Sequence, residues 1–241
     1  MIRIFSDYES LSLAAADLIA EQLRKSARDR GQVSLALSGG HTPRRAYELL
    51  SRDSYKIPWP KVDLFWSDER CVPPDDPRSN ERMVRETLID LIPIPEKRVH
   101  LLRCAGSPRH SAEEYDIFLK RYFSENGNSF DIILLGLGED GHTASLFPAS
   151  AALSEAIRWA MEVQRPQEDF YRITMTFPII NRASLIIFLA SGSQKARALA
   201  QVMDRSADIP ARRVQPINGQ LLWLVDQEAA AELHVNAPKI E

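Results

Sequence analysis

The chain has 241 residues, of which 44% are hydrophobic and 26% charged, and its formal net charge is −3. This charge gives no basic field to attract nucleic acid or an anionic membrane, and no apolar run approaches the ~18 residues of a membrane span. The first residues lack the apolar core of a secretory signal. We therefore expect a cytoplasmic protein in which Cys71 and Cys104 are reduced thiols.

Strand and helix patterns alternate along the whole chain. Apolar runs predict strands over 2–5, 33–37, 62–66, 99–102, 132–135, 156–163, 170–176, 185–190 and 221–225. Helical spacing predicts helices over 11–30, 44–51, 80–90, 111–124 and 196–203, a short turn or helix over 178–182, and a last short helix capped by Asp226. No linker or internal repeat interrupts this order. We expect one α/β domain over residues 1–241: a doubly wound, mostly parallel, Rossmann-like sheet with helices on both faces.

A small-residue turn, Ser38-Gly39-Gly40, follows the second predicted strand. Thr42 and Pro43 then suit the N-cap and first position of a helix. Backbone N–H groups and the helix dipole at such a turn favour an anion, typically phosphate. No Gly-Lys-Ser/Thr follows, so this is not a Walker loop. The alternative is a tight turn that needs glycine only for its shape.

The third predicted strand ends in Ser67-Asp68-Glu69-Arg70, and a proline-rich loop comes next. Ligands of open α/β sheets bind outside the carboxyl ends of the strands. These charges therefore indicate either ligand contacts or a solvated turn. Ser79 is expected to cap the helix that follows.

The stretch from Ile132 to Pro148 is the most informative. Its buried strand leads into Gly136, Gly138 and Gly141 with Asp140 and His142 among them. The glycine spacing matches a dinucleotide-binding fingerprint, but that motif needs an uninterrupted helix, and a proline arrives seven residues after the third glycine. We favour a catalytic turn that presents His142 as an acid–base group, oriented by Asp140. A structural histidine in a turn is the alternative.

A second small-residue turn, residues 191–194, ends in Lys195 at the start of a predicted helix. A lysine is unfavourable beside the positive end of a helix dipole. A bound anion would offset that repulsion, so this turn supports a phosphate site.

Five motifs occur in the order and spacing of a known family. They are Ser38-Gly39-Gly40-x-Thr42-Pro43, Ser67-Asp68-Glu69-Arg70, Ser79-Asn80, the block from Gly136 to Pro148, and Gly192-Ser193-Gln194-Lys195-Ala196. Over essentially its whole length the chain resembles the bacterial 6-phosphogluconolactonases. The resemblance implies the fold of the glucosamine-6-phosphate deaminases. It also implies a carboxylic ester hydrolase that converts 6-phospho-D-glucono-1,5-lactone to 6-phosphogluconate, with no cofactor or metal.

For that reaction we expect His142 to act as general base and Asp140 to orient it or hold its charged form, while Arg70 stabilises the oxyanion or the sugar hydroxyls. The N–H groups of the first turn and Lys195 are expected to hold the phosphate, and Arg172 matches an arginine of the family. The expected substrate-binding residues are Ser38, Gly39, Gly40, Thr42, Asp68, Glu69, Arg172 and Lys195. Asp68 and Glu69 could instead hold Arg70 in place. The substrate is the expected partner of a monomer or weak homodimer, with no nucleic acid or membrane.

The glucosamine-6-phosphate deaminases/isomerases are the main rival, because they share most of these motifs. They carry a glutamate immediately before the proline of the histidine block, where this chain has Phe147, and a tyrosine where it has Arg70. Both differences favour the lactonase. A non-catalytic sugar-phosphate binder is a third hypothesis, and the presence of Asp140 and His142 argues against it.

Overall fold

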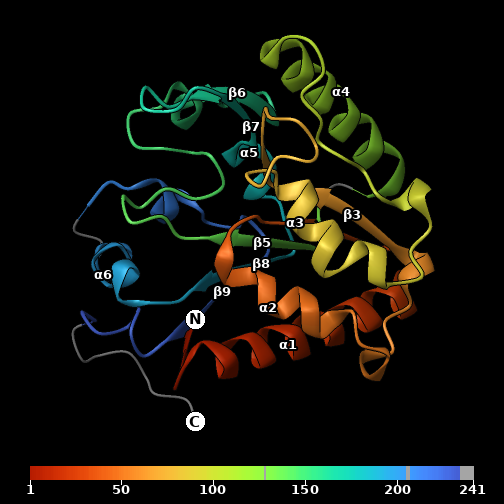
Figure 1. The fold of residues 1–241 in the computed structure, drawn as a ribbon, viewed down its shortest axis with the longest axis horizontal. Coiled ribbons are helices and arrows are strands. Elements are labelled where there is room, and N and C mark those ends of the chain that lie inside the picture. Colours follow the sequence, from red (N-terminus) through yellow and green to blue (C-terminus); the bar gives the residue numbers. More distant parts are fainter. Residues whose placement is uncertain (128, 205–206, 234–241) are drawn as a thin grey trace.

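A six-stranded parallel sheet forms the centre of the molecule (Figure 1). The computed structural model describes residues 1–127, 129–204 and 207–233. In spatial order the strands are β1 (Ile2–Phe5), β9 (Gln220–Asp226), β8 (Leu185–Ala190), β5 (Ile132–Gly136), β2 (Val33–Leu37) and β3 (Val62–Trp66). Every residue of β2, β3 and β8 is buried, as expected for strands covered on both faces. The predicted doubly wound, mostly parallel sheet is confirmed.

Helices cover both faces of this sheet. On one side lie α1 (Tyr8–Arg30) and α2 (His41–Leu50), and on the other lies α4 (Pro108–Asn126) (Figure 1). The remaining helices are α3 (Asn80–Thr87), α5 (Phe177–Ile180) and α6 (Ala196–Met203). An aromatic stripe on α4 surrounds the fully buried Phe65 of β3. Within the described residues, no helix is both long and apolar enough to cross a bilayer.

A second sheet, which the sequence patterns did not indicate, lies beyond the carboxyl end of β3. Its strands are β4 (Asp68–Arg70), β7 (Tyr171–Met175) and β6 (Ala160–Gln164), and both pairs are antiparallel. The three-residue β4 is too short and too charged to show a strand period. The strand predicted over 99–102 is not formed, because Val99 makes only an isolated bridge to Leu64.

One of the predicted helix caps is confirmed and two are wrong. Ser79 accepts the N–H of Arg82 at the start of α3. Gly40, not Thr42, is the N-cap of α2. Asp226 accepts the N–H of Ala229, but the residues after β9 form a turn rather than a helix.

The core depends on close aromatic packing between neighbouring strands. Phe188 of β8 is fully buried, and its ring stacks on that of Trp223 of β9 with 3.8 Å between the centroids. We expect Phe188→Ala to lower the free energy of unfolding by about 3–5 kcal/mol, because the lost side chain leaves a cavity. Urea denaturation measures the loss. Ile217→Ala, at a side chain that is 70% exposed, is the control and should change stability by less than ~0.5 kcal/mol; equal effects would contradict the prediction.

Candidate active site

A cavity of about 280 Å³ opens at the carboxyl ends of β2, β5 and β8, with β4 and β7 along one wall. Its lining contains most of the residues predicted as functional from the sequence: Ser38, Gly39, Gly40, Thr42, Asp68, Arg70, His142, Arg172 and Lys195. Asp140 and Glu69 are the predicted residues outside the lining. The sheet therefore brings turns that are more than 150 residues apart in sequence to one place.

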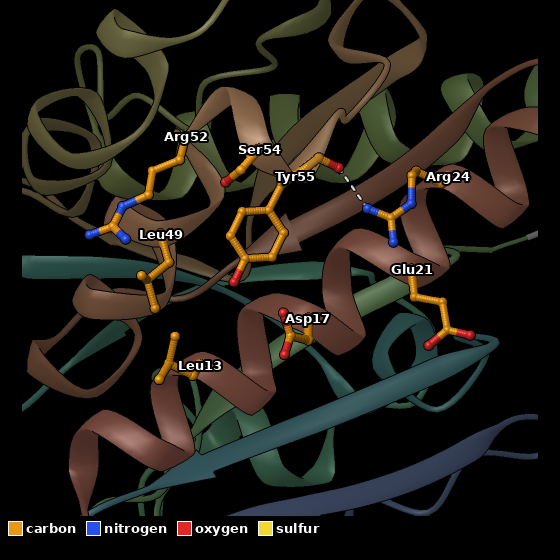
Figure 2. A pocket seen from close by; sticks show the side chains of 8 residues that line it. All are labelled: Leu13, Asp17, Glu21, Arg24, Leu49, Arg52, Ser54 and Tyr55. Carbon is orange, nitrogen blue, oxygen red and sulfur yellow. Dashed lines mark hydrogen bonds between the residues drawn. The ribbon is translucent and has the colours of Figure 1, made fainter.

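A larger hollow of about 540 Å³ lies elsewhere, between α1, the end of α2 and the 3₁₀ helix Asp53–Tyr55 (Figure 2). Its charged lining residues are Asp17, Glu21, Arg24 and Arg52. Arg24 donates to the carbonyl oxygen of Tyr55 at 2.6 Å. None of the residues that the sequence predicts as functional lines this hollow. The predicted functional residues are therefore concentrated around the smaller cavity.

Asp140 and His142 form a close pair in the turn after β5. Asp140 Oδ1 accepts the His142 backbone N–H at 3.1 Å and lies 2.5 Å from Nδ1 of the ring. Burial raises the pKa of Asp140, but hydrogen bonds and the charge of His142, together with Arg165, outweigh burial and lower it to about 2. An ionised Asp140 accepts the proton on Nδ1, which leaves Nε2 as the nitrogen able to act as a base.

The backbone of this turn holds the ring in place. Gly138 donates its N–H to the carbonyl oxygen of His142 at 2.8 Å, and a Cβ on Gly138 would lie only 2.0 Å from His142 Nδ1. The ring also packs against Phe147, with 4.6 Å between the centroids. A glycine is thus required at position 138 because the imidazole occupies the space of its side chain.

We expect Gly138→Ala to lower kcat by about 10²-fold, because the added methyl group must displace the imidazole from its position beside Asp140. Steady-state kinetics on the lactone test this. Gly136→Ala is the matched control two residues earlier, where a Cβ meets no atom within 4 Å. Equal losses in the two variants would show that the ring position is not the cause.

In the turn after β2, the backbone N–H of Ser38 does not point to a phosphate site as predicted but is hydrogen-bonded within the protein. The backbone N–H of Ser38 donates to the Tyr47 hydroxyl at 3.0 Å, and that hydroxyl donates back to the Ser38 carbonyl oxygen at 2.9 Å. The N–H group of Ser38 is therefore not available to a phosphate. Its hydroxyl is buried in the cavity lining and has no hydrogen-bond partner among the described residues, so the hydroxyl, and not the predicted N–H, is the Ser38 group that remains able to donate to an anion.

Gly39 is required by the approach of α3. A Cβ there would lie 1.8 Å from Oδ1 of Asn80, whose Nδ2 donates to the Asp68 carbonyl oxygen at 2.8 Å. This contact joins the turn after β2 to β4, and it explains why Ser79-Asn80 and the double glycine occur together in the family pattern.

In the turn after β8, residues 191–195, some hydrogen-bonding groups are also used within the protein. Lys195 ends the 3₁₀ helix Ser193–Lys195 and lines the cavity. Asp226 accepts the hydroxyl of Ser191 and the N–H of Gly192. The Gly192 N–H is thus used inside the protein, and the lysine side chain is the group of this turn that can meet an anion.

Arg70 and Arg172 face each other across neighbouring strands and both line the cavity. Arg172 donates two hydrogen bonds to Glu168, at 2.8 and 2.7 Å, and its Nη1 lies 4.0 Å from Asp68 Oδ2. Asp68 also accepts the Ser145 hydroxyl at 2.6 Å. Arg70 Nη1 donates to the carbonyl oxygen of Arg78. The two guanidinium groups are therefore fixed by the protein before any ligand arrives.

Glu69 points away from the cavity and holds the start of α3. Its carboxylate accepts the backbone N–H groups of Arg70, Asn80 and Glu81, at 2.7, 2.8 and 2.6 Å, and the Ser79 hydroxyl at 3.2 Å. Burial raises the pKa of Glu69 to about 7, against the opposing effect of these N–H groups. We infer a structural role for this residue at the start of α3, which differs from the predicted alternative of holding the Arg70 side chain in place.

Glu69→Gln should lower the free energy of unfolding by about 1–3 kcal/mol, because an amide NH₂ group would face N–H donors. The pKa of Glu69 in the fold lies above its ordinary value of 4.5, so its contribution is fully present below about pH 4.5 and is lost as the pH rises through 7. The deficit of the variant should therefore be larger at pH 5 than at pH 8 in urea denaturation. Glu114→Gln, at a side chain that is 63% exposed, is the control. A deficit that grows with pH would contradict the assignment.

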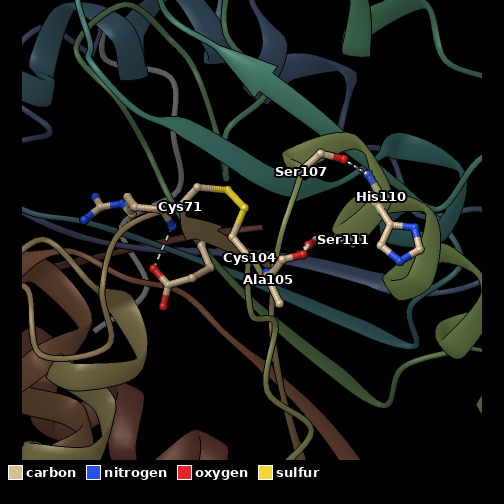
Figure 3. The surroundings of a disulfide bond; sticks show 8 residues. Cys71, Cys104, Ala105, Ser107, His110 and Ser111 are labelled. Atoms are coloured by element: carbon tan, nitrogen blue, oxygen red, sulfur yellow. Dashed lines mark hydrogen bonds between the residues drawn. A yellow bond between two sulfur atoms is a disulfide. The ribbon is translucent and has the colours of Figure 1, made fainter.

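The prediction of two reduced cysteines is wrong in this structure, because Cys71 and Cys104 form a disulfide (Figure 3). The segment before Cys104 runs beside β3, where the N–H of His100 donates to the Leu64 carbonyl oxygen at 2.8 Å. It thereby reaches the start of the loop that follows Arg70. Sequence spacing alone did not indicate this approach.

Three other histidines, His100, His110 and His234, have no role in the sequence analysis. His100 pairs with Asp63 at 2.8 Å and packs against Phe65, while His110 is exposed beside Glu114. Neither lines the cavity. His234 lies outside the described residues.

Comparison with known proteins agrees with this geometry. The family model described as glucosamine-6-phosphate isomerases/6-phosphogluconolactonase matches residues 6–223. The chain belongs to this family. The prediction of the family, and with it that of an enzyme, is confirmed.

Individual relatives divide along the two names of the family. A 6-phosphogluconolactonase from Nostoc is 40% identical over 97% of this chain and 98% of its own length. The crystal structure of a 6-phosphogluconolactonase from Thermotoga maritima superposes with a TM-score of 0.83 at 27% identity, over 94% of this chain and 99% of that one. A monomeric glucosamine-6-phosphate deaminase reaches a TM-score of 0.82 at 21% identity, over 96% and 99%, which shows the shared fold alone.

Proposed function

We propose that the chain hydrolyses 6-phospho-D-glucono-1,5-lactone to 6-phospho-D-gluconate, the second step of the oxidative pentose phosphate pathway. One observation carries the proposal: the ring of His142, paired with an ionised Asp140, lies in the same cavity as Arg70, Arg172 and Lys195. A base beside several cations suits the hydrolysis of an anionic ester.

In the proposed mechanism, His142 Nε2 takes a proton from a water molecule as the water oxygen bonds to C1 of the lactone. The C1 carbonyl oxygen becomes an oxyanion, which the Arg70 guanidinium stabilises. The carbonyl then re-forms, the bond from C1 to the ring oxygen breaks, and the imidazolium returns its proton to that oxygen. A positioned base of this kind contributes about 10²–10⁴-fold.

The phosphate group is assigned to the two turns at the sheet edge. Lys195 supplies a charge, Ser38 Oγ and the N–H groups of Gly39 and Gly40 supply donors, and Thr42 lies at the start of α2 beside them. A helix N-terminus favours such an anion. Arg172 is a further donor, although its pairing with Glu168 already uses two of its hydrogen bonds.

Phe147 favours the lactonase over the deaminase. In the deaminases a glutamate at this place supports the ring-opening histidine. Here the buried Phe147 ring packs on His142 instead and cannot accept a proton. The lactonase needs one base and one oxyanion partner, and it makes no use of a carboxylate at this position.

The proposal includes a cytoplasmic location, a monomer or weak homodimer of one domain over residues 1–241, and turnover without cofactor or metal. Disulfides are rare in reducing compartments. The Cys71–Cys104 bond is therefore the feature of the structure that stands against the location.

A coupled assay tests the reaction. Glucose-6-phosphate dehydrogenase generates the lactone, and its disappearance is followed with and without the protein. We expect accelerated loss, and we expect His142→Ala to reduce kcat by about 10²–10⁴-fold, because the water then has no base. His110→Ala, at an exposed histidine, is the control and should retain activity.

Glucosamine 6-phosphate is assayed in parallel for release of ammonia. Ammonia release without lactone hydrolysis would replace the proposal by the deaminase. A third outcome is that the protein catalyses neither reaction and that both it and His142→Ala bind 6-phosphogluconate. This outcome would indicate a non-catalytic sugar-phosphate binder.

A further inference from the structure

The turn between β6 and β7 carries two charged side chains, Arg165 and Glu168, that pair with residues of the candidate site. Arg165 Nη2 lies 3.6 Å from Oδ2 of Asp140, the oxygen that does not contact His142 Nδ1. Its Nη1 lies 3.6 Å from Glu168, which also holds Arg172. Arg165 therefore joins the catalytic pair to a cavity-lining arginine through one turn.

Arg165 also supports the surface against which the imidazole packs. Its guanidinium carbon lies 4.5 Å from the centre of the Phe147 ring, and the His142 ring lies 4.6 Å from the same centre. The cation–π contact fixes the guanidinium near the ring. One side chain thus touches both supports of His142, namely the carboxylate on Nδ1 and the aromatic ring.

The charge of Arg165 has a direct chemical consequence. A carboxylate 2.5 Å from an imidazole stabilises the protonated ring, and a protonated ring cannot take a proton from water. A cation on the other carboxylate oxygen offsets part of that effect. The side chain of Arg165 is 31% exposed, so solvent screens the interaction only in part.

We propose that Arg165 is a positioning residue of the catalytic pair: it fixes the plane of the Asp140 carboxylate and offsets its charge, so that His142 remains an unprotonated base. This inference rests on the proposed function for its kinetic readout. The contacts that carry it do not involve substrate, and none of the sequence motifs includes Arg165.

Other charged groups line the same cavity as His142 and are present in every variant. They are Asp68 and Arg70 on β4, Arg172 on β7, Lys195 after β8, and His41 at the start of α2. A change of pH response confined to a variant of Arg165 therefore reports on that residue.

The test uses Arg165→Met, which removes the charge, and Arg165→Lys, which keeps it. Both are assayed for lactone hydrolysis from pH 5.5 to 8. We expect the acid limb of the kcat profile of Arg165→Met to move upward by about half a pH unit to one unit. At pH 5.5, the acid end of the range, its kcat should fall about threefold to tenfold while KM stays within about twofold, and Arg165→Lys should restore most of the loss.

Arg158→Met is the matched control. Arg158 pairs with Glu155 three residues before it, at 2.6 Å, just ahead of β6, and it does not line the cavity. Its kcat and pH profile should remain those of the wild type. The inference fails if the acid limb of Arg165→Met stays in place, whether or not kcat falls. It also fails if only KM changes, since Arg165 would then act on substrate binding.

A second measurement needs no substrate. The ring protons of His142, assigned by their loss in His142→Ala, are titrated by NMR in the wild type and in Arg165→Met. The midpoint should move upward in the variant. A shifted midpoint in a protein without lactonase activity would retain the inference and reject the proposed function. An unshifted midpoint in an active lactonase would reject the inference and retain the proposed function.

Discussion

The junction between the two sheets at Ser67 determines where the site can form. The N–H of Ser67 donates to the Leu37 carbonyl oxygen at the end of β2, and its own carbonyl oxygen accepts the N–H of Met175 from β7, both at 2.8 Å. These bonds attach the antiparallel sheet to the carboxyl edge of the parallel one. A parallel sheet alone would offer an open edge, and the second sheet closes one side of that edge with arginines.

The acidic residues around the cavity act mainly as anchors. Asp68 accepts the Ser145 hydroxyl and thereby ties the turn after β5 to β4. Asp226 holds the turn after β8, and Glu69 holds the start of α3. The turns after β5 and β8 are thus each fixed by a carboxylate from another segment, whereas the Tyr47 hydroxyl holds the turn after β2. Because backbone N–H groups and hydroxyls are consumed by these anchors, fewer groups remain for a ligand than the glycine-rich sequence suggests.

Much of this arrangement could be predicted from the sequence, because parallel strands bring their carboxyl ends together. Apolar runs located β2, β5 and β8, and the turns that follow them supplied the predicted Ser38, His142 and Lys195. The second sheet was missed because β4 has only three residues and pairs with a strand about 100 residues away. Arg165 was missed for a related reason: it lies in a polar turn without a motif, and only the pairing of β6 with β7 brings it to Asp140. The disulfide depends in the same way on tertiary approach rather than on spacing.

The pairing of charges in the cavity divides its cations into two kinds. Arg172 and Arg165 each lie within 4.0 Å of carboxylate oxygens, on Asp68 and Glu168 for the first and on Asp140 and Glu168 for the second. Among the described residues, Arg70 and Lys195 have no carboxylate oxygen within that distance. A paired guanidinium carries little net attraction for a further anion, whereas an uncompensated cation in a partly enclosed site attracts one strongly. The two cations proposed to bind the oxyanion and the phosphate are therefore those whose charge the protein leaves uncompensated, and the paired arginines include the one proposed to position the base.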